Sequence, residues 1–221
     1  MSEKLQIFKI VSPQDLVRAG HPKIEATPLL TEKNFNIPPL NRNSGVIPSE
    51  ELFSNNVKSG PFYSYLIRDA HIHYRFGVVT IDDFVLCDTI AHFPTYLFPE
   101  SGIRDNNLFV FPVNDKNVHI SRACHVMHCN IDNYYHFNID IIGRGIYCLL
   151  LGKDGSLTSE NLTILVPSMK YPYQGEVFSI INKYKLPYIM LDGNASVVVD
   201  TSSVFQASSC SRTIFSMERG N

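Results

Sequence analysis

The chain has 221 residues, of which 44% are hydrophobic and 18% charged, and its formal net charge is −2 at pH 7. This composition is typical of a folded globular protein and excludes an intrinsically disordered chain. The small net charge provides no general attraction to nucleic acid or to an anionic membrane, so neither is expected as a partner.

The apolar runs, the first residues and the cysteines predict where in the cell the protein is located. No apolar run approaches the roughly 18–20 residues that cross a bilayer, and residues 1–15, MSEKLQIFKIVSPQD, lack the apolar core of a signal peptide. The five cysteines are an odd number without close pairs, which favours reduced thiols. We therefore expect a cytoplasmic protein without a membrane span.

Residues 1–61 are rich in proline. Seven of the 13 prolines lie there: Pro13, Pro22, Pro28, Pro38, Pro39, Pro48 and Pro61. Proline at this density disfavours long helices and central strands. We expect an irregular lead-in with one short helix near residues 13–19, followed by an α/β domain over residues 62–221.

The next stretch, residues 62–122, is strand-like. Short runs rich in β-branched and aromatic residues lie at 65–67, 71–76, 78–81, 84–88, 108–113 and 117–122. Turn signals at Gly77 and Asp82-Asp83 predict hairpins or a meander, and the last two runs predict another strand pair. His71 and His73 would share one strand face, where a structural or solvent-facing role is favoured over a metal site.

Residues 124–129, CHVMHC, combine two thiols with two imidazoles, which are ligand types that zinc prefers. On a strand, however, Cys124 and His128 face one side, whereas His125 and Cys129 face the other. Four such ligands do not converge on one ion. We expect a buried strand that leads into the following helix, and no bound metal.

Residues 132–151, DNYYHFNIDIIGRGIYCLLL, are the most informative stretch. At roughly 100° per residue, a helix gathers one polar stripe within an arc of about 80°. The stripe consists of Asn133, His136, Asp140, Arg144 and Tyr147. Asp132 is expected at the N-cap, and His136 and Asp140, four residues apart, within hydrogen-bonding reach directly or through one water. Two roles remain open: acid–base chemistry on a polar substrate, or a hydrogen-bonded network to a neighbouring element.

The pattern then becomes α/β. Strands are expected at 162–167, 188–191, 196–200 and 204–208, with one helix at 174–185. A strand, a helix and a strand within about 30 residues form a βαβ unit, which implies a parallel sheet. The chain contains no GxGxxG, no P-loop and no GxSxG motif.

The sequence at 132–144, DNYYHFNIDIIGR, resembles the Asn-Tyr-Tyr-His-Phe-x-x-Asp…Pro-Arg-Leu signature of glycosyltransferase family 61 (the DUF563 or capsular-polysaccharide type), with Gly143 where the family often has proline. Asn133, Tyr135, His136, Asp140 and Arg144 match the motif. The flanks are similar too: residues 70–89 resemble the strand-rich segment before the motif, and residues 161–192 resemble the segment after it. The resemblance covers about residues 62–208.

The resemblance implies an inverting, metal-independent transferase of the GT-B type, in which two Rossmann-like domains face each other across a cleft. It makes His136 and Asp140 the catalytic candidates, with Asp140 or His136 as the general base. It makes Asn133, Tyr135 and Arg144 substrate-binding. No cofactor is implied, because the nucleotide sugar is a co-substrate. Family members continue into a donor-binding second domain, so this chain is expected to be the N-terminal, acceptor-side part.

Three functions follow as expectations. The first is sugar transfer to a glycan or polysaccharide acceptor, completed by a separate donor-binding chain or by a homo-oligomer. The second is a non-catalytic carbohydrate-binding or partner protein derived from such an enzyme. The third is a hydrolase or metal-binding protein that uses the histidine-rich segments.

Overall fold

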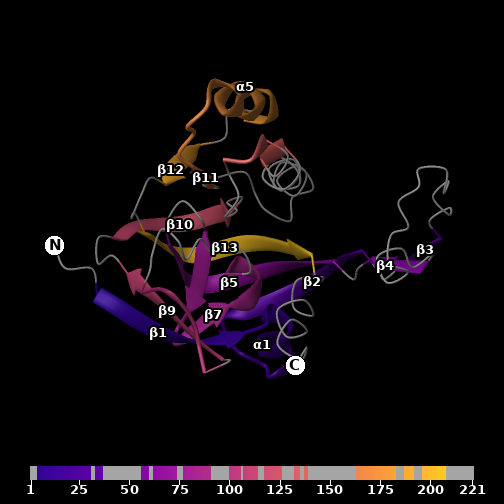
Figure 1. The fold of residues 1–221 in the computed structure, drawn as a ribbon, viewed down its shortest axis with the longest axis vertical. Helices are drawn as coiled ribbons and strands as arrows, with labels where there is room; N and C mark the ends of the chain where they lie inside the picture. The colour runs from indigo at the N-terminus through magenta and orange to yellow at the C-terminus, as the bar shows by residue number, and fades with distance from the viewer. Residues whose placement is uncertain are drawn as a thin grey trace, which may run out of the picture.

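Figure 1 shows the computed structural model of the chain. The described residues are 4–30, 33–36, 56–59, 62–73, 77–90, 100–105, 107–113, 117–125, 132–134, 137–138, 163–182, 187–191 and 196–207. They form a mixed α/β protein with a large mixed sheet and few helices. The expected α/β class is confirmed, whereas the GT-B architecture stays a prediction.

Eleven of the described strands form the main sheet. Ten of them lie in the order β12 (Tyr188–Leu191), β11 (Thr163–Pro167), β10 (Asn117–His125), β13 (Ser196–Ala207), β5 (Phe62–His73), β6 (Val78–Ile81), β7 (Phe84–Leu86), β1 (Lys4–Val11), β9 (Leu108–Val113) and β8 (Gly102–Arg104). The eleventh, β2 (Ile24–Leu30), pairs with β5. A separate hairpin, β3 (Lys33–Asn36) with β4 (Asn56–Ser59), lies apart from the main sheet (Figure 1).

One half of the sheet is parallel. Strands β12, β11, β10 and β13 all run in the same direction. The helix α5 (Pro172–Ile181) connects β11 to β12, so the predicted βαβ unit is confirmed. Strand β13 joins two predicted strands, 196–200 and 204–208, into one.

The other half is mainly antiparallel. Strands β5, β6 and β7 form the predicted meander, and Asp82 and Asp83 make the turn between β6 and β7. The predicted pairing of 108–113 with 117–122 is wrong, because β9 pairs with β1 and β8, whereas β10 lies in the parallel half. The end of the predicted strand 84–88 is helical, as part of α2 (Cys87–Ile90).

The irregular lead-in is wrong for residues 4–30. Strand β1 lies inside the sheet between β7 and β9, and β2 pairs along β5. The short helix is confirmed as α1 (Pro13–Arg18), with Ser12 as its N-cap and Pro13 in its first turn. The other proline in these elements, Pro28, lies where the register of β2 against β5 shifts, which is a position that strands tolerate.

Along one side of the long strand β5, the pairing strand changes at Asp69, and so does the alternation of the core-facing residues. Residues 62–67 pair with β2, and residues 71–73 pair with β6. The core-facing residues are Tyr65 and Ile67 before Asp69, then Ala70 and Ile72 after it, so strict alternation is broken. Asp69 has φ 50°, in the left-handed region that aspartate adopts more readily than most residues.

Two apolar clusters form the core around the described strands. The larger extends from α1 across the sheet to β11 and β12: Leu16, Ile24, Tyr65, Ile67, Ala70, Ile72, Val79, Ile81, Leu86, Ile120, Ala123, Leu165, Leu191, Val197 and Val199. The smaller lies in the antiparallel half: Phe8, Val78, Val85, Ile90, Phe109, Phe111 and Val113. Adjacent residues of β6 and β7 belong to different clusters, as the pleat requires. The sheet therefore buries both faces around β6 and β7.

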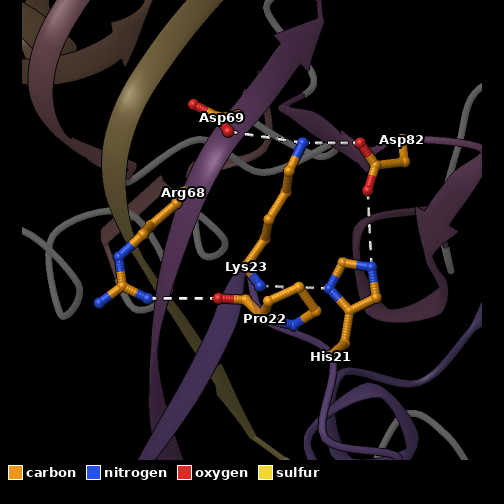
Figure 2. Close-up of polar contacts among 6 residues, drawn as sticks. All are labelled: His21, Pro22, Lys23, Arg68, Asp69 and Asp82. Carbon is orange, nitrogen blue, oxygen red and sulfur yellow. Dashed lines mark hydrogen bonds and ion pairs between the residues drawn. The ribbon is translucent and has the colours of Figure 1, made fainter.

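An ionic network ties the turn before β2 to the meander (Figure 2). Lys23 Nζ lies 2.7 Å from Asp82 Oδ1 and 3.4 Å from Asp69 Oδ2. His21 Nδ1 accepts a hydrogen bond from the Lys23 backbone N–H, and His21 Nε2 lies 3.5 Å from Asp82. Arg68 donates to the Pro22 carbonyl. The hydrogen bond to Asp82, more than any other contact, raises the pKa of Lys23.

We expect Asp82→Asn to lower the free energy of unfolding by about 0.5–1 kcal/mol, because Lys23 loses its closest anion at a partly exposed site. Asparagine tolerates the φ of 50° at this position, so the backbone is retained. Since the pKa of Lys23 is raised, the loss should be full below pH 10.5 and should fade at higher pH.

Urea unfolding measures this effect, and Asp105→Asn is the matched control. Asp105 also has a positive φ, 48°, but has no ion pair within the part of the chain that the structure describes. Equal losses in the two variants would show that the network contributes nothing.

Across the described residues, none of the helices has the length and apolar character needed to cross a bilayer.

Candidate ligand site at the carboxyl end of the parallel strands

The motif segment begins with a helical turn. The Phe137 N–H donates to the Asn133 carbonyl at 2.9 Å, and the Asn138 side-chain amide donates to the Tyr134 carbonyl at 2.8 Å. Phe137 is buried, whereas Asn133 and Tyr134 are exposed. This turn agrees with a helix that starts just after Asp132.

Most of the predicted site lies outside the described residues. Of the matched motif positions, the structure describes Asn133, whereas Tyr135, His136, Asp140 and Arg144 are not among the described residues. Their roles, and the contact of His136 with Asp140, stay predictions.

The motif follows a strand in a special position in the sheet. From β10 the chain adds β11 and then β12 on one side, and β13 then pairs with β10 on the other side. The direction of strand addition therefore reverses between β10 and β13. In open α/β sheets, ligands bind outside the carboxyl ends of the strands at such a reversal. Residues 132–138 come seven residues after the carboxyl end of β10 at His125.

Aromatic side chains from two segments meet beyond these strand ends. The segment after β10 contributes Tyr134 and Phe137, and the start of α5 contributes its N-cap Tyr171 and Tyr173 in its first turn. These four rings are here called the tyrosine cluster. Tyr173 is central: its ring centroid lies 5.1 Å from Tyr134, 5.7 Å from Phe137 and 5.9 Å from Tyr171.

The cluster combines a buried base with an open surface. Phe137 is 1% exposed and meets Tyr173 edge-on at 87°, so it supports the central ring. Tyr134 is 67% exposed and Tyr171 is 40% exposed. The rings of Tyr134 and Tyr171 are therefore accessible to a ligand, and both pack against the ring of Tyr173.

A charged pair lies beside the rings. Lys170 Nζ is 3.8 Å from the Asp132 carboxylate, and it also lies 5.7 Å from the centre of the Tyr171 ring. The pair links the same two segments that build the cluster. It presents both hydrogen-bond donors and acceptors next to the exposed rings.

Gln174 fixes the backbone that carries Lys170 and Tyr171. Its side chain is fully buried, and its Oε1 atom accepts from both of their backbone N–H groups, at 2.7 and 2.8 Å. This arrangement caps the start of α5. The exposed ring of Tyr171 therefore stands on an ordered backbone.

The Tyr173 hydroxyl lies inside the cluster and keeps its proton. Burial, together with the charges of Tyr171 and Asp132, raises the pKa of Tyr173. The phenol is therefore protonated at neutral pH. Its oxygen is buried and has no hydrogen-bond partner within the described residues.

Comparison of the chain with protein-family models, with curated proteins and with solved structures finds no match. The resemblance to family 61 therefore rests on the motif and its flanks.

The described histidines and cysteines, apart from His21, lie in the strands and in α2, where their contacts can be compared with those of a metal centre. His71 and His73 share a strand face, as predicted, with ring centroids 5.9 Å apart. His73 is buried and hydrogen-bonds to Thr80 Oγ1 at 2.9 Å, which is a structural role. Among the residues described, no three His, Cys, Asp or Glu side chains are placed to hold a metal. The expectation that the protein binds no metal stays a prediction.

Cys124 is disulfide-bonded, and its partner lies outside the described residues. The expectation of reduced thiols is therefore wrong at this position. Cys124 and His125 are both buried at the end of β10, which confirms the predicted buried strand up to His125. Disulfides persist mainly in oxidising compartments. The cytoplasmic location stays a prediction, and reduced thiols are no longer an argument for it.

Lys170, Tyr171 and Tyr173 are not among the site residues predicted from the sequence. Their signal is the run Lys-Tyr-Pro-Tyr-Gln at 170–174, in which aromatic residues flank a proline at a helix start. That run becomes informative only when the fold brings it next to the motif segment.

Proposed function

We propose that the chain is the acceptor-side part of an inverting, metal-independent glycosyltransferase, which transfers a sugar from a nucleotide sugar to a glycan or polysaccharide acceptor. The observation that carries the proposal is the place of the family-61-like motif, directly after the strand where the order of the parallel strands reverses. The parallel strands β12, β11, β10 and β13 are also compatible with a Rossmann-like half of a GT-B enzyme.

In the proposed reaction, the oxygen of an acceptor hydroxyl attacks the anomeric carbon of the donor sugar. Asp140 or His136 takes the hydroxyl proton as general base. The bond between the anomeric carbon and the phosphate oxygen breaks, and its electron pair leaves with the nucleoside diphosphate. Arg144 is suited to stabilise the departing phosphate, because its planar guanidinium binds anions through paired hydrogen bonds. Asn133 and Tyr135 would orient the acceptor.

A second candidate is a non-catalytic carbohydrate-binding protein. It is favoured by one observation, the exposed rings of Tyr134 and Tyr171, because these residues can bind a ligand without any catalytic group. The donor site of the proposed enzyme would lie on another chain, on a further segment or on a second copy.

Transfer from radiolabelled UDP-N-acetylglucosamine and UDP-xylose to an immobilised glycan array tests the proposal. The transferase predicts incorporation of label into a defined subset of the glycans when the donor-binding partner is supplied. Glycan binding without incorporation, with any partner supplied, would instead support the second candidate.

A further inference from the structure

We infer that the tyrosine cluster is a stacking site for the ring of a neutral pyranose in the acceptor. This inference deepens the proposed function, on which it rests, by assigning a substrate class to residues that the motif does not include. It joins four rings and one ion pair from two segments that the sequence separates by more than thirty residues.

The first step concerns shape. Tyr171 and Tyr173 stack on each other with an interplanar angle of 12°, so no planar base inserts between them. Tyr134 is tilted by 53° against Tyr173. A ligand therefore lies against the outer face of an exposed ring and does not enter a sandwich. The apolar C–H face of a pyranose fits such a surface, because aromatic faces carry partial negative charge and bind polarised C–H groups.

The second step concerns charge. Lys170 and Asp132 together are neutral, and they lie 3.8 Å apart beside the rings. An anionic group such as a phosphate would gain from Lys170 but would be repelled by Asp132. Sugar hydroxyls both donate and accept hydrogen bonds, so they match a pair that offers an ammonium and a carboxylate. The rim therefore favours a neutral polyol over a nucleotide.

The third step concerns order. Gln174 holds the backbone N–H groups of Lys170 and Tyr171, and buried Phe137 supports Tyr173. A ligand thus meets rings that are already positioned. Because few side chains have to be ordered on binding, the entropic cost that would lower the affinity is small. Aromatic side chains on a fixed backbone are the usual anchors of tight binding sites.

The test measures affinity by calorimetry, without a donor, for the oligosaccharide that binds most strongly on the glycan array. Tyr171→Ala and Tyr134→Ala should each weaken binding at least about tenfold, as expected for the loss of one stacked ring. Tyr171→Phe keeps the ring and should bind within about threefold of the parent. Tyr188→Ala is the matched control, because Tyr188 is 46% exposed but lies on β12 outside the cluster.

Several outcomes overturn the inference. Unchanged oligosaccharide affinity in both alanine variants would exclude the cluster as the sugar site, while transfer activity would leave the proposed function intact. Binding of UMP but of no sugar on the array would assign the rings to a nucleotide. If Tyr188→Ala weakens binding as much as the cluster variants do, the lost affinity reflects damage to the fold. The same holds if the alanine variants melt at a lower temperature and Tyr171→Phe also binds weakly.

Discussion

We expect Asp140→Asn to lower the rate of sugar transfer by about 10²–10⁴-fold, which corresponds to about 3–5 kcal/mol of activation free energy. The substitution retains the size of the side chain but removes the basic oxygen that would accept the acceptor proton. Acceptor affinity and the melting temperature should change little. The measurement is the turnover number with saturating donor and acceptor, in the presence of the donor-binding partner.

His136→Ala should fall in the same range if the imidazole orients or polarises Asp140. The double variant should then be little slower than either single variant, because residues that act as one unit are not additive. Arg144→Lys is a matched test of phosphate binding, since it keeps the charge but loses the planar fork. If Asp140→Asn retains near-normal turnover and melts well below the parent, the polar stripe is a structural network.

The second large effect is acid destabilisation through His73. Burial, with a smaller contribution from His71, lowers the pKa of His73 to about 3 from an ordinary value of 6.5. As the pH falls below 6.5, the unfolded chain binds a proton that the folded protein rejects until about pH 3. The stability that the neutral, buried His73 provides is therefore fully present above pH 6.5. About 5 kcal/mol of the free energy of unfolding should be lost between pH 6.5 and about pH 3.

Urea unfolding at pH 7 and at pH 4 should show about 3 kcal/mol of this loss, because pH 4 lies about 2.5 units below 6.5 and the remainder is lost only near pH 3. His73→Gln keeps a side chain that can hydrogen-bond to Thr80 but cannot be protonated, so its stability should depend much less on pH. His119→Gln changes an exposed histidine and is the control. Carboxylates titrate in all three proteins, so the difference between variants isolates His73. Identical pH dependence in the parent and His73→Gln would contradict the buried, neutral imidazole.

Local patterns predicted several elements well. The strands at 108–113 and 188–191 were predicted with the bounds observed for β9 and β12. Both are short apolar runs bounded by turn signals, which is a local property. The βαβ unit followed from the same rule, because a helix between two buried strands requires a parallel pairing.

Other features depend on contacts between distant segments. Strand β1 differs from the prediction because the prolines that disfavour strands in residues 1–61 all lie after it, and Lys4–Val11 contains none. Strands β9 and β10 are adjacent in sequence but pair elsewhere, which no turn signal could indicate. Strand β5 continues through Asp69, which has a positive φ, and pairs with β13 on both sides of it, so the predicted run at 65–67 and the start of the run at 71–76 belong to one strand.

The candidate site was predicted in part. The sequence identified the segment after β10 through its motif and its helical spacing, and the first turn agrees with that prediction. It did not identify Tyr171 and Tyr173, which pack against Tyr134 and Phe137 only because α5 follows a neighbouring parallel strand. The roles of His136 and Asp140 remain predictions that rest on the resemblance.

The most direct test of ligand binding at the carboxyl ends of β10 and β11 is a fluorine NMR titration. The chain has 11 tyrosines and no tryptophan, so labelling with 3-fluorotyrosine gives a small set of signals that Tyr→Phe variants assign. A saturating array-selected oligosaccharide should shift the signals of Tyr134, Tyr171 and Tyr173, and leave those of Tyr65 and Tyr188 in place. Saturation with no change at the first three, or with shifts confined to other tyrosines, would contradict a ligand site at this end of the sheet.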